Sequence, residues 1–258
     1  MDLLFDPQLA ASYTSPPQRI RILSEHWVHR QLYCPSCGRD NVMQYGNNSR
    51  IADFYCVECG ENYELKSQSK NRFDAKLVDG AYGTMMARLA GPGLPNLLLL
   101  GYEAQALQVT NLLVVPKQFF IPALIEQRQP LRASARRAGW IGCNILLDQI
   151  PQAGRIFLIR DKQPASKADV LAKWQRILFV RDQHDLSAKG WLLSVMRCIE
   201  QLGRATFALE DVYSCEDELK LTYPSNQNIR PKIRQQLQVL RNKGYLKFLG
   251  NGTYRLLI

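Results

Sequence analysis

The spacing of hydrophobic positions predicts that the first part of the chain forms a sheet flanked by helices. Residues 96–102 (NLLLLGY) and 108–115 (QVTNLLVV) are continuous apolar runs of strand length, as expected for strands covered on both faces. After a break at residues 15–18, Ile20 and Trp27 belong to an apolar stripe at helical spacing. Further elements are expected as a strand at 155–160 and helices at 79–89 and 167–180. The pattern favours the α/β class with a mixed sheet.

The pattern changes at residues 181–186, a polar stretch that we interpret as a linker. Beyond it, the apolar spacing predicts helices at 187–202, from 209 onward and at 228–243, and strands at 245–249 and 253–257. Three helices followed by a β-hairpin is the winged-helix arrangement, a variant of the helix-turn-helix. We therefore predict one domain over residues 1–181 and a winged-helix DNA-binding domain over residues 182–258.

The composition adds an excess of positive charge to this picture. The 258 residues carry a net charge of +10 and a pI near 9.3, which favours a polyanionic partner such as nucleic acid. We find no secretory signal and no apolar run of membrane-spanning length. With seven cysteines in the chain, we therefore expect a reducing cytoplasm and no membrane partner. Cys143, Cys198 and Cys215 are expected to be ordinary thiols.

The other four cysteines form two CxxC pairs. Cys34 and Cys37 are separated from Cys56 and Cys59 by eighteen residues, and a glycine follows each pair. This spacing is typical of a zinc site in which two tight turns each supply two thiolates. Because four thiolates fill the tetrahedral positions of Zn²⁺, the site is expected to be structural. Disulfides or a redox CxxC are the alternative interpretations.

The second cysteine pair lies at the tip of a predicted hairpin with strands at 50–56 and 62–67. Pairing Asp53 with Glu64 also pairs Ile51 with Lys66, and alternation along the strands then directs Asp53, Glu64 and Lys66 to one face. Converging carboxylates can hold Mg²⁺, and a nearby ammonium can stabilise charge that develops on a phosphate. The hairpin therefore predicts a site for metal-assisted phosphodiester hydrolysis.

Three polar residues of the first predicted helix were also weighed as metal ligands. Glu25, His26 and His29 precede the first CxxC pair. Polar residues opposite an apolar helix stripe usually face solvent. We therefore expect a solvated helix face rather than a metal site.

Two segments are candidates for DNA contact. In residues 132–144, Arg136 and Arg137 can bind phosphates or a guanine edge, and the indole of Trp140 can pack on a base. The alternative is a solvated loop with a buried tryptophan. The third predicted helix is the second candidate, because residues 226–258 contain seven basic and no acidic side chains. Its expected DNA-binding residues are Asn228, Arg230, Lys232, Arg234, Gln235 and Gln238, and protein contact is the alternative use.

Asp53, the ten residues after it and then Glu64-Leu65-Lys66 resemble the active-site motif of the PD-(D/E)XK nucleases. Ala52 stands where the motif's name has proline, at a position that varies in that family. Longer segments, among them residues 52–56, 135–145 and 232–238, resemble the methyl-directed type IIM restriction endonucleases.

This resemblance implies a Mg²⁺-dependent enzyme that cleaves double-stranded DNA at 5′-GATC-3′ where the adenine carries an N6-methyl group. It implies that Asp53, Glu64 and the Leu65 carbonyl bind the magnesium ion and that Lys66 acts on the attacking water. Both domains would recognise the methylated site, and Trp140 is the candidate for methyl contact in the first. We also expect a monomer in a bacterial cytoplasm.

Two other interpretations stay open. A non-catalytic regulator that joins a zinc ribbon to a winged helix would explain the cysteines, the charge and the third helix. It would leave Asp53, Glu64 and Lys66 without a shared purpose. A nuclease with another modification specificity is the second alternative.

Overall fold

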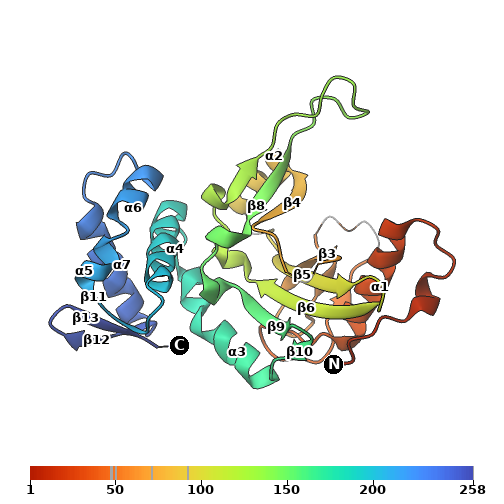
Figure 1. Ribbon diagram of the computed structural model, residues 1–258, viewed down its shortest axis with the longest axis horizontal. Helices are drawn as coiled ribbons and strands as arrows, with labels where there is room; N and C mark the ends of the chain where they lie inside the picture. Colours follow the sequence, from red (N-terminus) through yellow and green to blue (C-terminus); the bar gives the residue numbers. More distant parts are fainter. Residues whose placement is uncertain (47–48, 50, 71, 92, 258) are drawn as a thin grey trace. The chain divides into compact units, whose positions relative to one another are not determined.

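The computed structural model (Figure 1) describes all residues except 47, 48, 50, 71, 92 and 258. The chain forms two compact units. Unit 1 comprises Met1–Leu147 and Ala153–Gln175, and unit 2 comprises Asp148–Gln152 and Arg176–Ile258. The domain boundary expected between residues 181 and 182 stays a prediction. None of the helices formed by the described residues has the length and apolar character needed to cross a bilayer.

The predicted α/β architecture is confirmed in unit 1, which contains a mixed seven-stranded sheet of order β1-β2-β3-β5-β6-β9-β10. Strands β3 and β5 are parallel, and the other neighbours are antiparallel. The strands are β1 (Met43–Gln44), β2 (Phe54–Tyr55), β3 (Asn62–Gln68), β5 (Asn96–Glu103), β6 (Gln108–Val115), β9 (Ile156–Arg160) and β10 (Gln163–Pro164). The two apolar runs form β5 and β6, whose leucines and valines are buried as predicted.

Helices flank this sheet. The first, α1 (Pro16–Gln31), packs against β1 and β3. Helix α3 (Lys167–Arg176) follows β10 and ends earlier than predicted, because Leu178–Asp182 continues as the 3₁₀ helix η6. Shorter 3₁₀ turns are η1 (Pro7–Ala10), η2 (Lys117–Phe119), η3 (Pro122–Leu124), η4 (Leu147–Gln149) and η5 (Gln152–Gly154).

A second, three-stranded sheet of order β4-β8-β7 belongs to the same unit. It consists of β4 (Lys76–Ala81), β7 (Ile125–Gln127) and β8 (Gly142–Leu146), and the loop between β7 and β8 projects from it (Figure 1). Helix α2 (Tyr82–Ala90) follows β4. The helix predicted at 79–89 is therefore wrong at its start, because Asp79 pairs with Cys143 of β8 and extends a strand instead.

Unit 2 has the predicted winged-helix arrangement. Its helices are α4 (Leu186–Gln201), α5 (Leu209–Tyr213), α6 (Glu216–Thr222) and α7 (Ile229–Asn242), and its strands are β11 (Thr206–Ala208), β12 (Leu246–Gly250) and β13 (Thr253–Leu256). The wing turns at Gly250-Asn251-Gly252, where all three residues have positive φ, a conformation that favours glycine and asparagine. Strand β11, which was not predicted, pairs with β13.

Candidate active site and metal cluster

The structure brings the four predicted cysteines together. The Sγ atoms of Cys34, Cys37, Cys56 and Cys59 all lie within 4.8 Å of one another. The Cys34–Cys59 and Cys37–Cys56 separations are 3.6 Å, far longer than the about 2 Å of a disulfide. Four thiolates placed tetrahedrally about 2.3 Å from one ion would be about 3.8 Å apart. The cluster therefore fits a single tetrahedral metal ion.

Two matching turns hold these thiols in place. The amide of Gly38 donates to the Cys34 carbonyl, and the amide of Gly60 donates to the Cys56 carbonyl. Both glycines have positive φ, at 81° and 70°, so a side chain would be strained at either position. The cysteines at the start of each turn are buried and those at the end are exposed.

The second turn leads directly into the strand that carries the candidate catalytic residues. Phe54 pairs with Tyr63, and continuing this register by one residue sets Asp53 opposite Glu64, as predicted. The ladder between β2 and β3 stops at Phe54, and Ile51 lies outside it, half exposed. The predicted pairing of Ile51 with Lys66 is therefore wrong, and the start of that predicted strand, at residue 50, lies outside the described residues.

Asp53 and Glu64 line the same cleft. The amide of Leu65 donates to Asp53 Oδ2 over 2.7 Å, which fixes the carboxylate against β3. Burial raises the pKa of Asp53 above its ordinary value. The cleft has a volume of about 410 Å³, and Leu65 and Asp79 also line it. The carboxylates therefore face one solvent-filled space, as a shared cation would require.

Lys66 also points to this group of acids. Its Nζ lies 3.6 Å from Glu64 Oε1 and 2.7 Å from Asp79 Oδ1. Burial lowers the pKa of Lys66, but the ion pairs with Asp79 and Glu64 outweigh burial and hold that pKa above its usual value. The guanidinium of Arg88 pairs with the other oxygen of Glu64 over 2.9 Å. Lys66 is therefore charged within a network of alternating signs.

Asp79 and Arg88 were missing from the predicted site. Both belong to the segment formed by β4 and α2. The sequence did indicate that the turn beginning at Asp79 could approach the site, but not that its side chain would bind Lys66.

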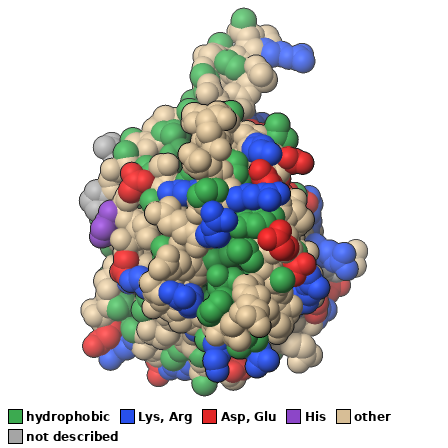
Figure 2. All heavy atoms as spheres, turned by 90° about the vertical axis from the view of Figure 1, so that its left-hand side faces the viewer, with side chains coloured by type: hydrophobic (Ala, Val, Ile, Leu, Met, Phe, Trp, Pro, Cys, Tyr) green, Lys and Arg blue, Asp and Glu red, His purple; other side chains and the backbone are tan. Residues whose placement is uncertain are grey.

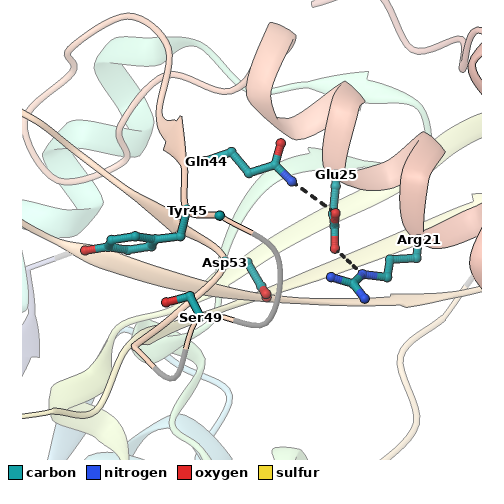
Figure 3. A pocket seen from close by; sticks show the side chains of 7 residues that line it. Arg21, Glu25, Gln44, Tyr45, Ser49 and Asp53 are labelled. Carbon is teal, nitrogen blue, oxygen red and sulfur yellow. Dashed lines mark hydrogen bonds and ion pairs between the residues drawn. The ribbon is translucent and has the colours of Figure 1, made fainter.

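A second cavity lies beside Asp53. It has a volume of about 200 Å³ and is lined by residues of α1 and of the segment before β2, among them Arg21, Glu25 and Gln44. Arg21 and Gln44 bind the two oxygens of Glu25 over 2.6 and 3.0 Å, and Figure 3 shows these side chains above the segment that carries Asp53. Glu25 is only 8% exposed. The expectation that Glu25 faces solvent is therefore wrong, because its partners satisfy it in the interior.

The predicted contact loop lies between β7 and β8. Arg136 and Arg137 are exposed. Trp140 is half-buried, and the guanidinium of Arg137 lies 4.9 Å from the centre of its ring. A Cβ on Gly142 would come within 2.8 Å of the same ring, so glycine is needed there for the tryptophan to fold back. One face of the indole is thus packed, which combines features of both predicted interpretations.

Helix α7 presents most of its candidate residues to solvent. Asn228, Arg230, Arg234, Gln235 and Gln238 are exposed and Lys232 is half-buried, whereas Gln236 is buried. On the face of the molecule shown in Figure 2, Lys and Arg side chains surround a patch of hydrophobic ones.

Two of the exposed arginines have partners within unit 2. Arg230 pairs with Glu216 of α6 over 2.6 Å, and Arg234 donates to the Tyr213 hydroxyl over 2.8 Å. The absence of acids from residues 226–258 therefore does not leave the helix without counter-charge.

A mixed-sheet core that gathers two carboxylates and a lysine in one cleft, together with a four-thiolate cluster and a winged helix, defines a nuclease-like class of DNA-binding protein. Residues 1–183 match the DpnI family, described as the Dam-replacing family, and residues 187–256 match the Dam-replacing HTH domain. The chain belongs to the Dam-replacing family. This membership indicates a methylation-dependent restriction endonuclease, and it argues against the non-catalytic regulator.

Proposed function

We propose that this protein is a Mg²⁺-dependent restriction endonuclease that cleaves double-stranded DNA at 5′-GATC-3′ sites carrying N6-methyladenine. The observation that carries the proposal is the convergence of Asp53, Glu64 and Lys66 on one cleft in a member of this family. The sequence resemblance to methyl-directed enzymes supports the choice of substrate.

The donor set in the cleft fits magnesium. Asp53 and Glu64 offer carboxylate oxygens and Leu65 a backbone carbonyl, and Mg²⁺ prefers such oxygen ligands. Among the described residues, the four cysteines are the group of three or more acids, histidines or cysteines with ligand atoms within 4.8 Å. Two acids alone would leave positions for water and for a DNA phosphate, as a catalytic magnesium site needs.

The division of labour follows from the positions of the side chains. When bound, Mg²⁺ polarises the phosphate and lowers the pKa of the attacking water. Lys66 brings a positive charge to the same cleft, where it would orient that water and stabilise the negative charge developing on the phosphate. Asp53, pinned by the Leu65 amide, would keep its ligand oxygen in a fixed direction.

The cysteine cluster would hold a structural zinc ion. Soft thiolates in a tetrahedral set favour Zn²⁺, and four of them leave no open position for chemistry. Because the second cysteine pair directly precedes β3, the ion would fix the strand that carries Glu64 and Lys66.

We further propose that both domains, residues 1–181 and 182–258, read the methylated site. The first would use Arg136, Arg137 and Trp140, and the second the exposed polar residues of α7. A methyl group buried in a dry pocket contributes about 0.8 kcal/mol, so a single reader discriminates weakly. Two linked readers multiply their discrimination.

One experiment separates the candidate functions. The purified protein, as a cytoplasmic monomer would be, is incubated with plasmids whose GATC sites are methylated, hemimethylated or unmethylated, with Mg²⁺ or with a chelator of it. We expect cutting at GATC in the methylated plasmid and only with Mg²⁺. A lack of cutting in every reaction would favour a regulator, and cutting elsewhere would favour a different modification specificity.

A further inference from the structure

Asp79 is the acid nearest to the Lys66 ammonium. The Nζ–Oδ1 distance is 2.7 Å, against 3.6 Å to Glu64. The Asp79 side chain is only 9% exposed, and a carboxylate is rarely buried to that degree without a charged partner. Asp79 is therefore held in the interior by this pair, and the pair in turn fixes one end of the lysine.

The fold aims Asp79 at the cleft through a β-bulge. Along the β4–β8 ladder Asp79 pairs with Cys143 and Ala81 with Gly142, so that Gly80 is left over between them. Such bulges bend a strand and redirect its side chains. The Gly80 amide also donates to Asp79 Oδ1 over 2.7 Å, which fixes the carboxylate in the orientation that meets Lys66.

The same segment supplies the opposite charge to Glu64. Helix α2 begins immediately after β4, and its Arg88 binds Glu64 Oε2. Asp79 thus attracts the lysine while Arg88 attracts the glutamate. The two charges of β3 are drawn to separate partners, and this limits how closely Lys66 can approach Glu64.

We propose that Asp79 is a positioning residue for Lys66. It keeps the ammonium away from the glutamate oxygens that would bind magnesium and directs it toward the space for the scissile phosphate. Without Asp79, Glu64 is the nearest acid in the cleft, and Lys66 would close on it and compete with the metal ion. This inference rests on the proposed nuclease function, because it gives Lys66 a task to be positioned for.

The test compares Asp79→Asn and Asp79→Glu with the control Glu126→Gln. Glu126 pairs with Lys76 within the same small sheet, so the control removes an ion pair there without touching Lys66. The first measurement needs no metal: the metal-free protein is treated with an amine-reactive ester, and acylation of Lys66 is followed by mass spectrometry. The second is the single-turnover rate of cleavage at saturating protein.

We expect Lys66 to be acylated severalfold faster in Asp79→Asn than in the wild type and in Glu126→Gln. The cleavage rate should fall about 10- to 100-fold, as for a misplaced catalytic group, with DNA affinity unchanged. Asp79→Glu should partly restore both, and it guards against a folding defect in Asp79→Asn.

Two results would overturn the inference. Wild-type acylation and cleavage in Asp79→Asn would show that the acid does not hold the lysine. Slower cleavage with unchanged acylation would mean that Asp79 acts on the metal directly. Failure of the wild type to cut any plasmid would instead refute the proposed function, while the acylation measurement would still report on the contact.

Discussion

The hydroxyl of Tyr63 lies 3.1 Å from the Sγ of Cys34, and both residues are fully buried. Burial and the nearby Cys34 raise the pKa of Tyr63 above its ordinary range, so the phenol stays protonated and can donate to a thiolate. Successive residues of a strand face opposite sides. Tyr63 therefore faces the cysteine cluster while the next residue, Glu64, faces the cleft, and β3 connects the two sites.

Replacing Tyr63 by Phe should destabilise unit 1 by about 1–3 kcal/mol, because a buried sulfur loses its donor. Thermal unfolding of the zinc-loaded protein measures this, and Tyr13→Phe, at an exposed tyrosine, provides the control. Equal effects of the two substitutions would show that the bond to Cys34 contributes no stability.

Removal of the metal should have a larger effect. A strong chelator should abolish the near-UV circular dichroism of unit 1 together with cleavage, because binding energy at a structural zinc site is folding energy. Zinc released per chain can be measured with a colorimetric dye, and Cys143→Ser, outside the cluster, should leave the stoichiometry at one. An unchanged near-UV spectrum after complete zinc loss would contradict a structural role.

Lys66→Ala should separate binding from chemistry. Cleavage should fall by at least about 10²- to 10³-fold, the usual effect of losing a group that stabilises transition-state charge. Binding of methylated duplex, measured without Mg²⁺, should stay close to that of the wild type. Lys70→Ala is the matched control, since Lys70 is exposed and pairs with Asp74. Normal turnover of Lys66→Ala would remove this residue from the mechanism.

The sequence predicted the parts of the site that depend on local geometry. The positions of Asp53 and Glu64 follow from a two-stranded ribbon only a few residues long, and the cysteine spacing is itself a sequence motif. Alternation along one strand then placed Lys66 with Glu64. Each step needed only neighbours along the chain, which is why it could be made from residues alone.

Asp79 and Glu25 could not be found in this way. Asp79 is a strand residue because of its pairing with Cys143, which lies far along the chain, whereas the local apolar pattern of residues 79–89 favours a helix. Glu25 has helical neighbours that suggest a solvated face, and it is buried because Gln44 and Arg21 bind its carboxylate. Long-range contacts override local preference in both cases.

Trp140→Ala tests the reader in unit 1. If the indole contacts the methyl group, the substitution should reduce cleavage of methylated plasmid most and shrink the ratio of methylated to unmethylated cutting. Because Arg137 stacks on this ring, Arg137→Ala should be measured beside it and should weaken DNA binding without changing that ratio. An unchanged methyl preference in Trp140→Ala would assign the ring to packing on Gly142 alone.

Helix α7 allows base reading and phosphate binding to be distinguished. Gln238 is exposed and Gln236 is buried, so Gln238→Ala should reduce discrimination between GATC and scrambled duplexes by about 1–3 kcal/mol if its amide reads adenine. Arg234→Ala should instead weaken both duplexes alike and reduce the salt dependence of binding by about one phosphate contact. Fluorescence anisotropy of the full chain without Mg²⁺, over a series of salt concentrations, gives both quantities. If Gln238→Ala behaved like Arg234→Ala, α7 would bind the DNA backbone and the sequence would be read elsewhere.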